Sequence, residues 1–200
     1  MKNSILIAVF SILFSTVAYT QDSSRMHEAG IIFNSLNSFG VTYRVGTPTS
    51  LWRFNAVGLN TNTQVSTQTN AETTTKNYNG TFRVGKEFRK IIDENFALRL
   101  GADLVGSFNT NKSDRNDISP NNFDTYSNSN AYGIGAGMVL GLNYKVKRLI
   151  IGAEILPTIQ YSRQTTKSGG TNLVEQTVKT SGTSVTILSS SAFLSIAYQF

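Results

Sequence analysis

Apolar and polar side chains alternate with a period of two residues through most of this chain, from about residue 28 to the C-terminus. The last segment shows this most clearly, because small or polar residues separate a set made of Leu194, Ile196, Tyr198 and Phe200. A period of two places such sets on opposite faces of a β-strand. The chain is therefore expected to fold into strands that separate an apolar phase from a polar one.

The alternation recurs in eight segments, which cover residues 28–34, 39–46, 52–59, 78–88, 96–108, 132–145, 149–163 and 193–200. Eight amphipathic strands predict an all-β fold, an antiparallel up-and-down β-barrel of about eight strands that crosses a membrane. Pro157 interrupts one segment. Because proline removes a donor from the hydrogen-bond ladder and a closed barrel has no free edge, we expect a β-bulge there.

The connections alternate in length. Those at 46–50, 89–94 and 145–148 are short, whereas those at 61–77, 109–130 and 164–181 are long and polar, with a short exception at 36–38. All long connections would then leave the barrel at the same end, an asymmetry typical of outer-membrane barrels. The threonine-rich stretch 61–75 has high β propensity, so either continued strands or a disordered loop fits it.

The content of the polar face indicates which face meets lipid. It carries charges of both signs, at Glu28, Arg44, Arg53, Arg83, Glu87, Arg99, Asp103, Lys145 and Glu154. An eight-stranded lumen is just wide enough to be filled by side chains, so these charges are expected to pair inside it. A glycine row at Gly133, Gly135, Gly137 and Gly141 would leave room for long arginine side chains, or would line a narrow water passage.

Aromatic residues gather near both ends of the apolar face, as lipid interfaces favour. One expected girdle, beside the short turns, consists of Trp52, Phe88, Phe96, Tyr144 and Phe200. The other, beside the long connections, consists of Phe33, Phe39, Tyr78, Phe108, Tyr132 and Tyr161. The apolar face is therefore expected to point outward into lipid.

The N-terminus has the three-part layout of a secretory signal peptide: one positive charge, a short apolar run and a small-residue region ahead of Gln21. We expect residues 1–20 to be cleaved, 21–27 to form a periplasmic N-terminal extension, and 28–200 to form the barrel. The chain has no cysteine, which excludes a lipoprotein anchor and disulfides.

Residues 28–200 resemble the small outer-membrane barrels of the OmpA/OmpX type. The features that carry the resemblance are the preceding signal peptide, the eight segments, the loop asymmetry and the terminal phenylalanine. The resemblance implies an integral protein of the outer membrane of a Gram-negative bacterium, with its long loops extracellular. It also implies that the barrel-assembly machinery reads an assembly signal made of Leu194, Ile196, Tyr198 and Phe200.

Several functions are disfavoured. Some barrels of this size are enzymes that use a histidine near the outer rim, but His27, the only histidine, is expected at the periplasmic end, so no catalytic residue is predicted. No cofactor or metal is predicted. The lysines and arginines are scattered and form no basic face, so nucleic-acid binding is not predicted either. The expected partners are membrane lipid, the assembly machinery and another outer-membrane protein. A structural or interaction role through the polar outer loops fits best, with a passive narrow channel or an accessory subunit of a larger complex as alternatives.

Overall fold

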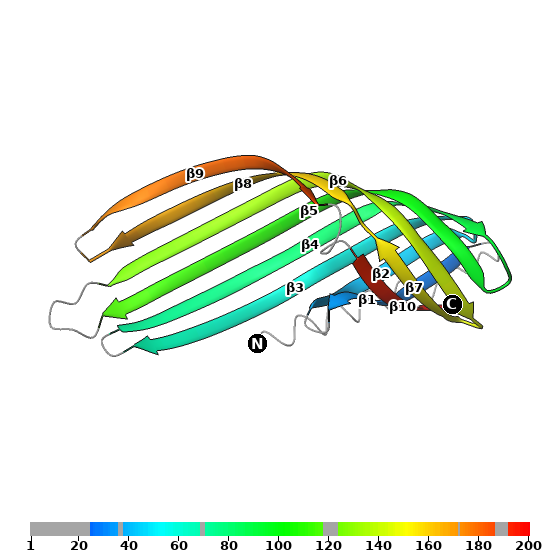
Figure 1. Cartoon of the computed structure of the whole chain (residues 1–200), viewed down its shortest axis with the longest axis horizontal. Coiled ribbons are helices and arrows are strands. Elements are labelled where there is room, and N and C mark those ends of the chain that lie inside the picture. Colours follow the sequence, from blue (N-terminus) through cyan, green and yellow to red (C-terminus); the bar gives the residue numbers. More distant parts are fainter. Residues whose placement is uncertain (1–24, 36–37, 69–70, 118–123, 172, 187–191) are drawn as a thin grey trace.

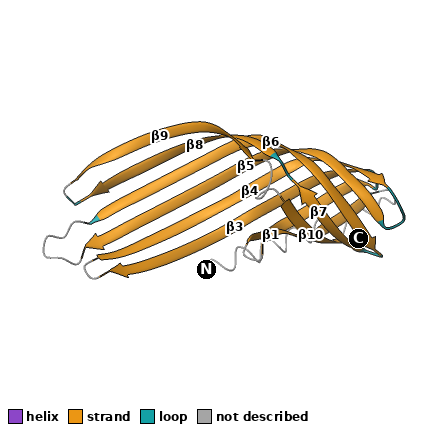
Figure 2. Cartoon of the chain, in the orientation of Figure 1, coloured by secondary structure: helices purple, strands orange, loops and turns teal. Residues whose placement is uncertain are grey.

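The computed structural model describes residues 25–35, 38–68, 71–117, 124–171, 173–186 and 192–200, which form antiparallel β-strands (Figure 2). The strands are β1 (Met26–Ser35), β2 (Ser38–Thr47), β3 (Ser50–Gln68), β4 (Ala71–Ile91), β5 (Phe96–Asp117), β6 (Thr125–Val146), β7 (Leu149–Ile155), β8 (Thr158–Gly170), β9 (Leu173–Thr186) and β10 (Ala192–Gln199). Within these residues no helix is long and apolar enough to cross a membrane. The predicted signal peptide, 1–20, lies outside the described residues.

Eight strands close into a ring in the order β1, β2, β3, β4, β5, β6, β7 and β10, because β10 pairs with β1. The end of the ring that carries both the start of β1 and the end of β10, here named the turn end, is tied by two backbone bonds. His27 N–H donates to the Phe200 carbonyl at 3.3 Å, and Phe200 N–H donates to the His27 carbonyl at 3.0 Å. The predicted antiparallel up-and-down fold is confirmed, and β1 already begins at Met26.

The predicted bulge at Pro157 is wrong. β6 pairs with β7 through Leu140 and Ile155, and with β8 through Gly137 and Thr158, so two residues face two residues across the interruption. The Pro157 carbonyl still accepts a hydrogen bond from Met138 N–H at 2.9 Å. β7 and β8 thus keep one unbroken register against β6. The interruption at Pro157 only removes one backbone N–H donor, because proline has none.

Beyond the ring, β3, β4, β5 and β6 continue, and β8 and β9 pair alongside β6, to form an open, curved sheet, here named the outer sheet (Figure 1). Pairing persists to Gln68–Ala71 in β3–β4, to Arg115–Thr125 in β5–β6 and to Gly170–Leu173 in β8–β9. Loops were therefore wrongly predicted for most of 109–130 and 164–181, while the strand alternative for 61–75 is correct. Both faces are mostly polar there, with scattered exposed apolar residues such as Val65, Val174 and Val178, so the apolar alternation ends although the backbone pairing continues.

The ring is apolar outside and charged inside, the reverse of a soluble barrel. On the outside, Leu104, Ile134 and Phe39 are 72%, 69% and 63% exposed. On the inside, Arg44 and Glu87 are fully buried. The interior is not uniformly polar, however, because it also buries Ile32, Leu51, Val139 and Leu156. The direction predicted for the apolar face is the one observed.

Candidate functional site

The ring encloses a cluster of five arginines and four carboxylates, here named the lumen charge network. Its members are Glu28, Arg44, Arg53, Arg83, Glu87, Arg89, Arg99, Asp103 and Glu154. They come from β1, β2, β3, β4, β5 and β7, and all are buried. Such burial is costly unless each charge finds partners of opposite sign, so the pairing decides whether the lumen is filled.

Glu87 on β4 lies at the centre of the network. Its carboxylate is 2.7 Å from Arg89 and 2.6 Å from Arg99, and it also lies 3.5 Å from Arg44 and 3.6 Å from Arg53. One carboxylate thus holds four guanidinium groups from four neighbouring strands. Removing its charge would leave several cations together in a dry interior.

Other pairs cross the lumen from wall to wall. Arg53 donates to both Glu154 oxygens, at 3.1 and 3.3 Å, from strands β3 and β7, which lie opposite each other in the ring of eight. Arg99 lies 2.6 Å from Glu154, and Arg83 donates to the Leu156 carbonyl at 3.4 Å and to the Thr158 hydroxyl. The Arg53–Glu154 contact therefore spans the lumen, and the contacts of Arg99 and Arg83 fill space beside it.

Two members of the predicted set have partners or positions that parity alone did not indicate. Asp103 lies 3.4 Å from Arg53 and 3.6 Å from Arg83. Lys145 is half-buried beside a recess of about 130 Å³ at the turn end, and it joins none of the ion pairs among the described residues. The structure brings together the eight predicted charges other than Lys145.

Arg89 was missed because the sequence placed it in the short connection 89–94. It donates to both Glu28 oxygens, at 2.5 and 2.7 Å, and to Glu87 at 2.7 Å, and so closes the network toward the turn end. The signal was present: Arg89 has the same parity as Arg83 and Glu87. Extending the alternation by one period would have found it.

Some glycines of the lumen wall lie against side chains of the lumen charge network, and others do not. A Cβ at Gly137 would lie 3.1 Å from an Arg83 nitrogen, and one at Gly152 would lie 3.0 Å from an Arg99 nitrogen. Gly133 and Gly135 instead face Gln160, and Gly141 faces Glu154. Glycine therefore makes room for a long arginine at one position of the predicted row, and at Gly152, which the row did not include.

The residues of the predicted assembly signal point outward from β10. Leu194, Ile196, Tyr198 and Phe200 are 50%, 40%, 49% and 43% exposed. The Phe200 ring stacks on His27 with 5.9 Å between centroids, and His27 Nδ1 lies 2.8 Å from the Tyr43 hydroxyl. His27 thus lies at the turn end, next to the C-terminus.

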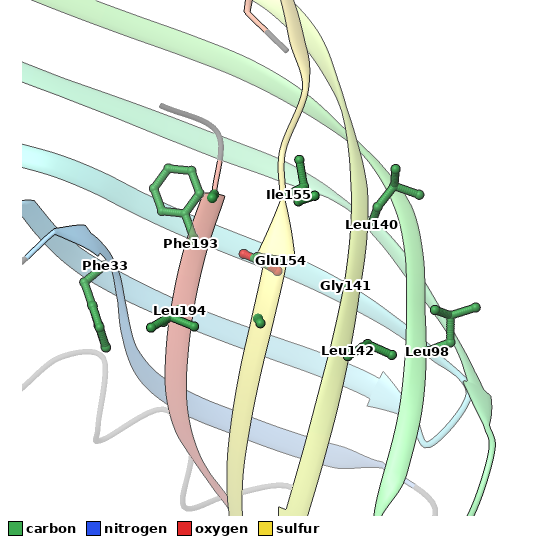
Figure 3. A pocket seen from close by; sticks show the side chains of 11 residues that line it. Phe33, Leu98, Leu140, Gly141, Leu142, Glu154, Ile155, Phe193 and Leu194 are labelled. Carbon is green, nitrogen blue, oxygen red and sulfur yellow. The ribbon is translucent and has the colours of Figure 1, made fainter. Parts of the chain in front are cut away.

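The outer surface carries a shallow apolar depression of about 770 Å³. Figure 3 shows Leu140 and Leu142 of β6, Ile155 of β7 and Leu194 of β10 around it. Ala153 and Ala192 also line it, and their methyl groups leave space between these larger neighbours. The depression is continuous with the outward apolar face of the ring.

Most of the predicted aromatic girdle residues are on this outward face. Beside the turn end, Trp52, Phe88 and Phe96 are exposed, Lys86 lies 5.0 Å from the Trp52 ring centroid, and the rings of Phe96 and Tyr144 are 4.8 Å apart. At the opposite end of the ring the exposed members are Phe39, Tyr78, Tyr132 and Tyr161, while Phe33 and Phe108 are half-buried.

Comparison with known proteins finds a likeness among solved structures. No family model matches the chain, and no curated protein matches it. Among solved structures, the chain is similar to a major outer membrane protein from Thermus thermophilus, with 10% sequence identity and a TM-score of 0.45. That match covers 88% of this chain and 100% of the other.

Proposed function

We propose that this chain is an integral outer-membrane β-barrel protein with a closed lumen, which acts through its outer sheet as a structural or interaction protein. The observation that carries the proposal is the polarity of the ring. Exposed apolar side chains surround it between two aromatic girdles, while its charges are buried and paired inside. An apolar belt of this extent would drive aggregation in water, and lipid is the solvent that suits it.

The outer sheet supports the interaction role. β4, β5 and β6 have 21, 22 and 22 residues, whereas a strand needs only about 9–11 residues to cross a bilayer. The excess carries a surface rich in threonine, asparagine and serine well beyond the membrane. Another protein of the same membrane, or an external surface, can contact it there.

A passive channel is the weaker alternative, because Arg53 and Glu154 join opposite walls across the lumen. The direct test of the main proposal is cell fractionation together with gel mobility before and after heating. We expect recovery with outer membranes and a heat-dependent shift, because folded barrels resist detergent. Recovery of the chain as a soluble periplasmic protein would refute membrane insertion.

We also propose that the C-terminal strand is an assembly signal. Phe200→Asp, or deletion of Phe200, is expected to lower insertion and leave unassembled chain in the periplasm. Because Phe200 also stacks on His27, His27→Ala is the matched control for lost packing. Insertion of the deletion variant at the wild-type level would contradict an assembly signal.

A further inference from the structure

A row of lysines crosses the outward face of the outer sheet. Lys76 on β4 is directly opposite Lys112 on β5, Lys112 is opposite Asn128 on β6, and Asn128 is opposite Lys167 on β8. Each lysine has the parity of the lipid-facing residues of its strand, such as Phe82, Leu104 and Tyr161. The three ammonium groups therefore project from one face of four adjacent strands.

The row needs an explanation because like charges directly opposite each other destabilise a sheet. Lys76 and Lys112 are both exposed and form such a pair. Lys167 is partly neutralised by Glu175, 3.3 Å away, with their side chains 55% and 51% exposed. Tyr126 donates to Glu175 at 2.9 Å, and together with Lys167 it holds the pKa of the Glu175 carboxyl below its ordinary value. An anion between Lys76 and Lys112 would relieve the repulsion that remains.

The position of the row relative to the aromatic girdle indicates which kind of anion could bind between Lys76 and Lys112. On the same face, Lys112 and Asn128 are each four residues beyond an aromatic residue of the girdle that lies away from the turn end, Phe108 and Tyr132 respectively. Four residues span about 13 Å along a strand, or roughly 10 Å along the membrane normal at the usual barrel tilt. The polar headgroup layer begins where the hydrocarbon ends, and lysine side chains can reach back toward it.

Charges on this face are ordered by distance from the girdle. The charged residues level with the girdle or between it and the row are basic, Arg163 on β8 and Lys179 on β9, among the described residues of the outer sheet. Acidic residues occur further out, at Asp114 and Glu72, with Glu175 beside Lys167. A basic layer next to an aromatic girdle complements the charge of phosphate groups at a lipid surface.

We propose that Lys76, Lys112 and Lys167 bind the phosphate groups of lipid headgroups in the outer leaflet. This inference rests on the outer-membrane location proposed above. The row fixes the barrel at a defined depth, with the girdle in the interface and the outer sheet beyond the headgroups.

The test compares lipid A that carries its phosphates with dephosphorylated lipid A, bound to the purified, folded protein in detergent and counted by native mass spectrometry. We expect the phosphorylated form to bind about tenfold more tightly at low salt, and the difference to shrink as salt screens the charges. Equal binding of the two forms would overturn the proposal. Inorganic phosphate at the same phosphate concentration should not displace the lipid, and displacement would refute a lipid site.

Variants locate the effect. Lys76→Gln/Lys112→Gln should abolish the preference for the phosphorylated form. Lys90→Gln/Lys147→Gln removes the same charge at the turn end, where both lysines are exposed, and should retain the preference. Loss in both variants would show an effect of net charge and overturn the row as a site, as would retention in the first. If the double variant does not show the heat-dependent mobility of a folded barrel, the same binding comparison is made with Lys112→Gln alone.

Failure of this inference and failure of the proposed function give different results. A chain recovered outside the membrane fraction contradicts the outer-membrane location itself. A chain that inserts normally but binds both lipid A forms equally contradicts only the phosphate site.

Discussion

In β3, β4, β5 and β6 the same face of the sheet lines the lumen of the ring and then the concave side of the outer sheet, yet its chemistry differs between the two regions. On β4 the inward positions in the ring are Arg83, Glu87 and Arg89, all buried and ion-paired. Further along the same face, Thr75 makes only a 3.4 Å hydroxyl contact with Ser113. In the ring an opposing wall supplies counter-charges, whereas the open sheet has no such wall, so its polar groups, including the exposed Arg115 of β5, stay in contact with water. Closure of the sheet therefore determines where charge can be buried.

The largest expected effect separates two glutamates of β4. Glu87→Gln removes the carboxylate that holds four arginines and should lower the free energy of unfolding by about 3–5 kcal/mol. Glu72→Gln, on the exposed outer part of β4, should stay within about 0.5 kcal/mol of wild type. Urea titration in detergent, followed by gel mobility, measures both. Equal losses would abolish the distinction between the two regions.

Arg99 tests the network from its cationic side. Arg99→Met removes 2.6 Å contacts to both Glu87 and Glu154 and should cost about 3 kcal/mol, at the lower end of the range for broken buried pairs. Glu87 retains three other arginines, which limits the loss. The same urea titration applies, and an unchanged midpoint would show that these contacts contribute nothing to the folded barrel.

A smaller effect is expected when part of the outer sheet is removed. Joining Asn60 to Asn79, which face each other, through an Asn-Gly turn deletes the outer hairpin of β3 and β4. The ring should still close, and its unfolding midpoint should fall less than that of Glu87→Gln, because the deletion removes Tyr78 of the aromatic girdle but no member of the lumen charge network. Loss of the heat-dependent mobility shift would show instead that the ring depends on the outer sheet.

The sequence predicted the part of the fold where solvents differ across the sheet. Alternation identified the ring strands, the outward face and eight of the nine charges of the lumen charge network, because an exposed apolar exterior and a charged interior require opposite side chains. It stopped at Arg89 only because a short turn was assumed there. It could not identify the outer parts of β5, β6, β8 and β9, because water on both faces imposes no polarity pattern. It could not assign the Arg53–Glu154 pair either, since pairing across a lumen depends on closure rather than spacing.

The most direct test of a closed, charge-paired lumen is the conductance of the purified wild-type barrel in a planar bilayer, with insertion verified independently. Pairs that join opposite walls, such as Arg53 with Glu154, occupy the cross-section. We therefore predict little or no steady current, and at most a small leak from Arg99→Met. A large, stable and voltage-independent conductance from the wild-type protein would contradict the closed lumen and favour the channel.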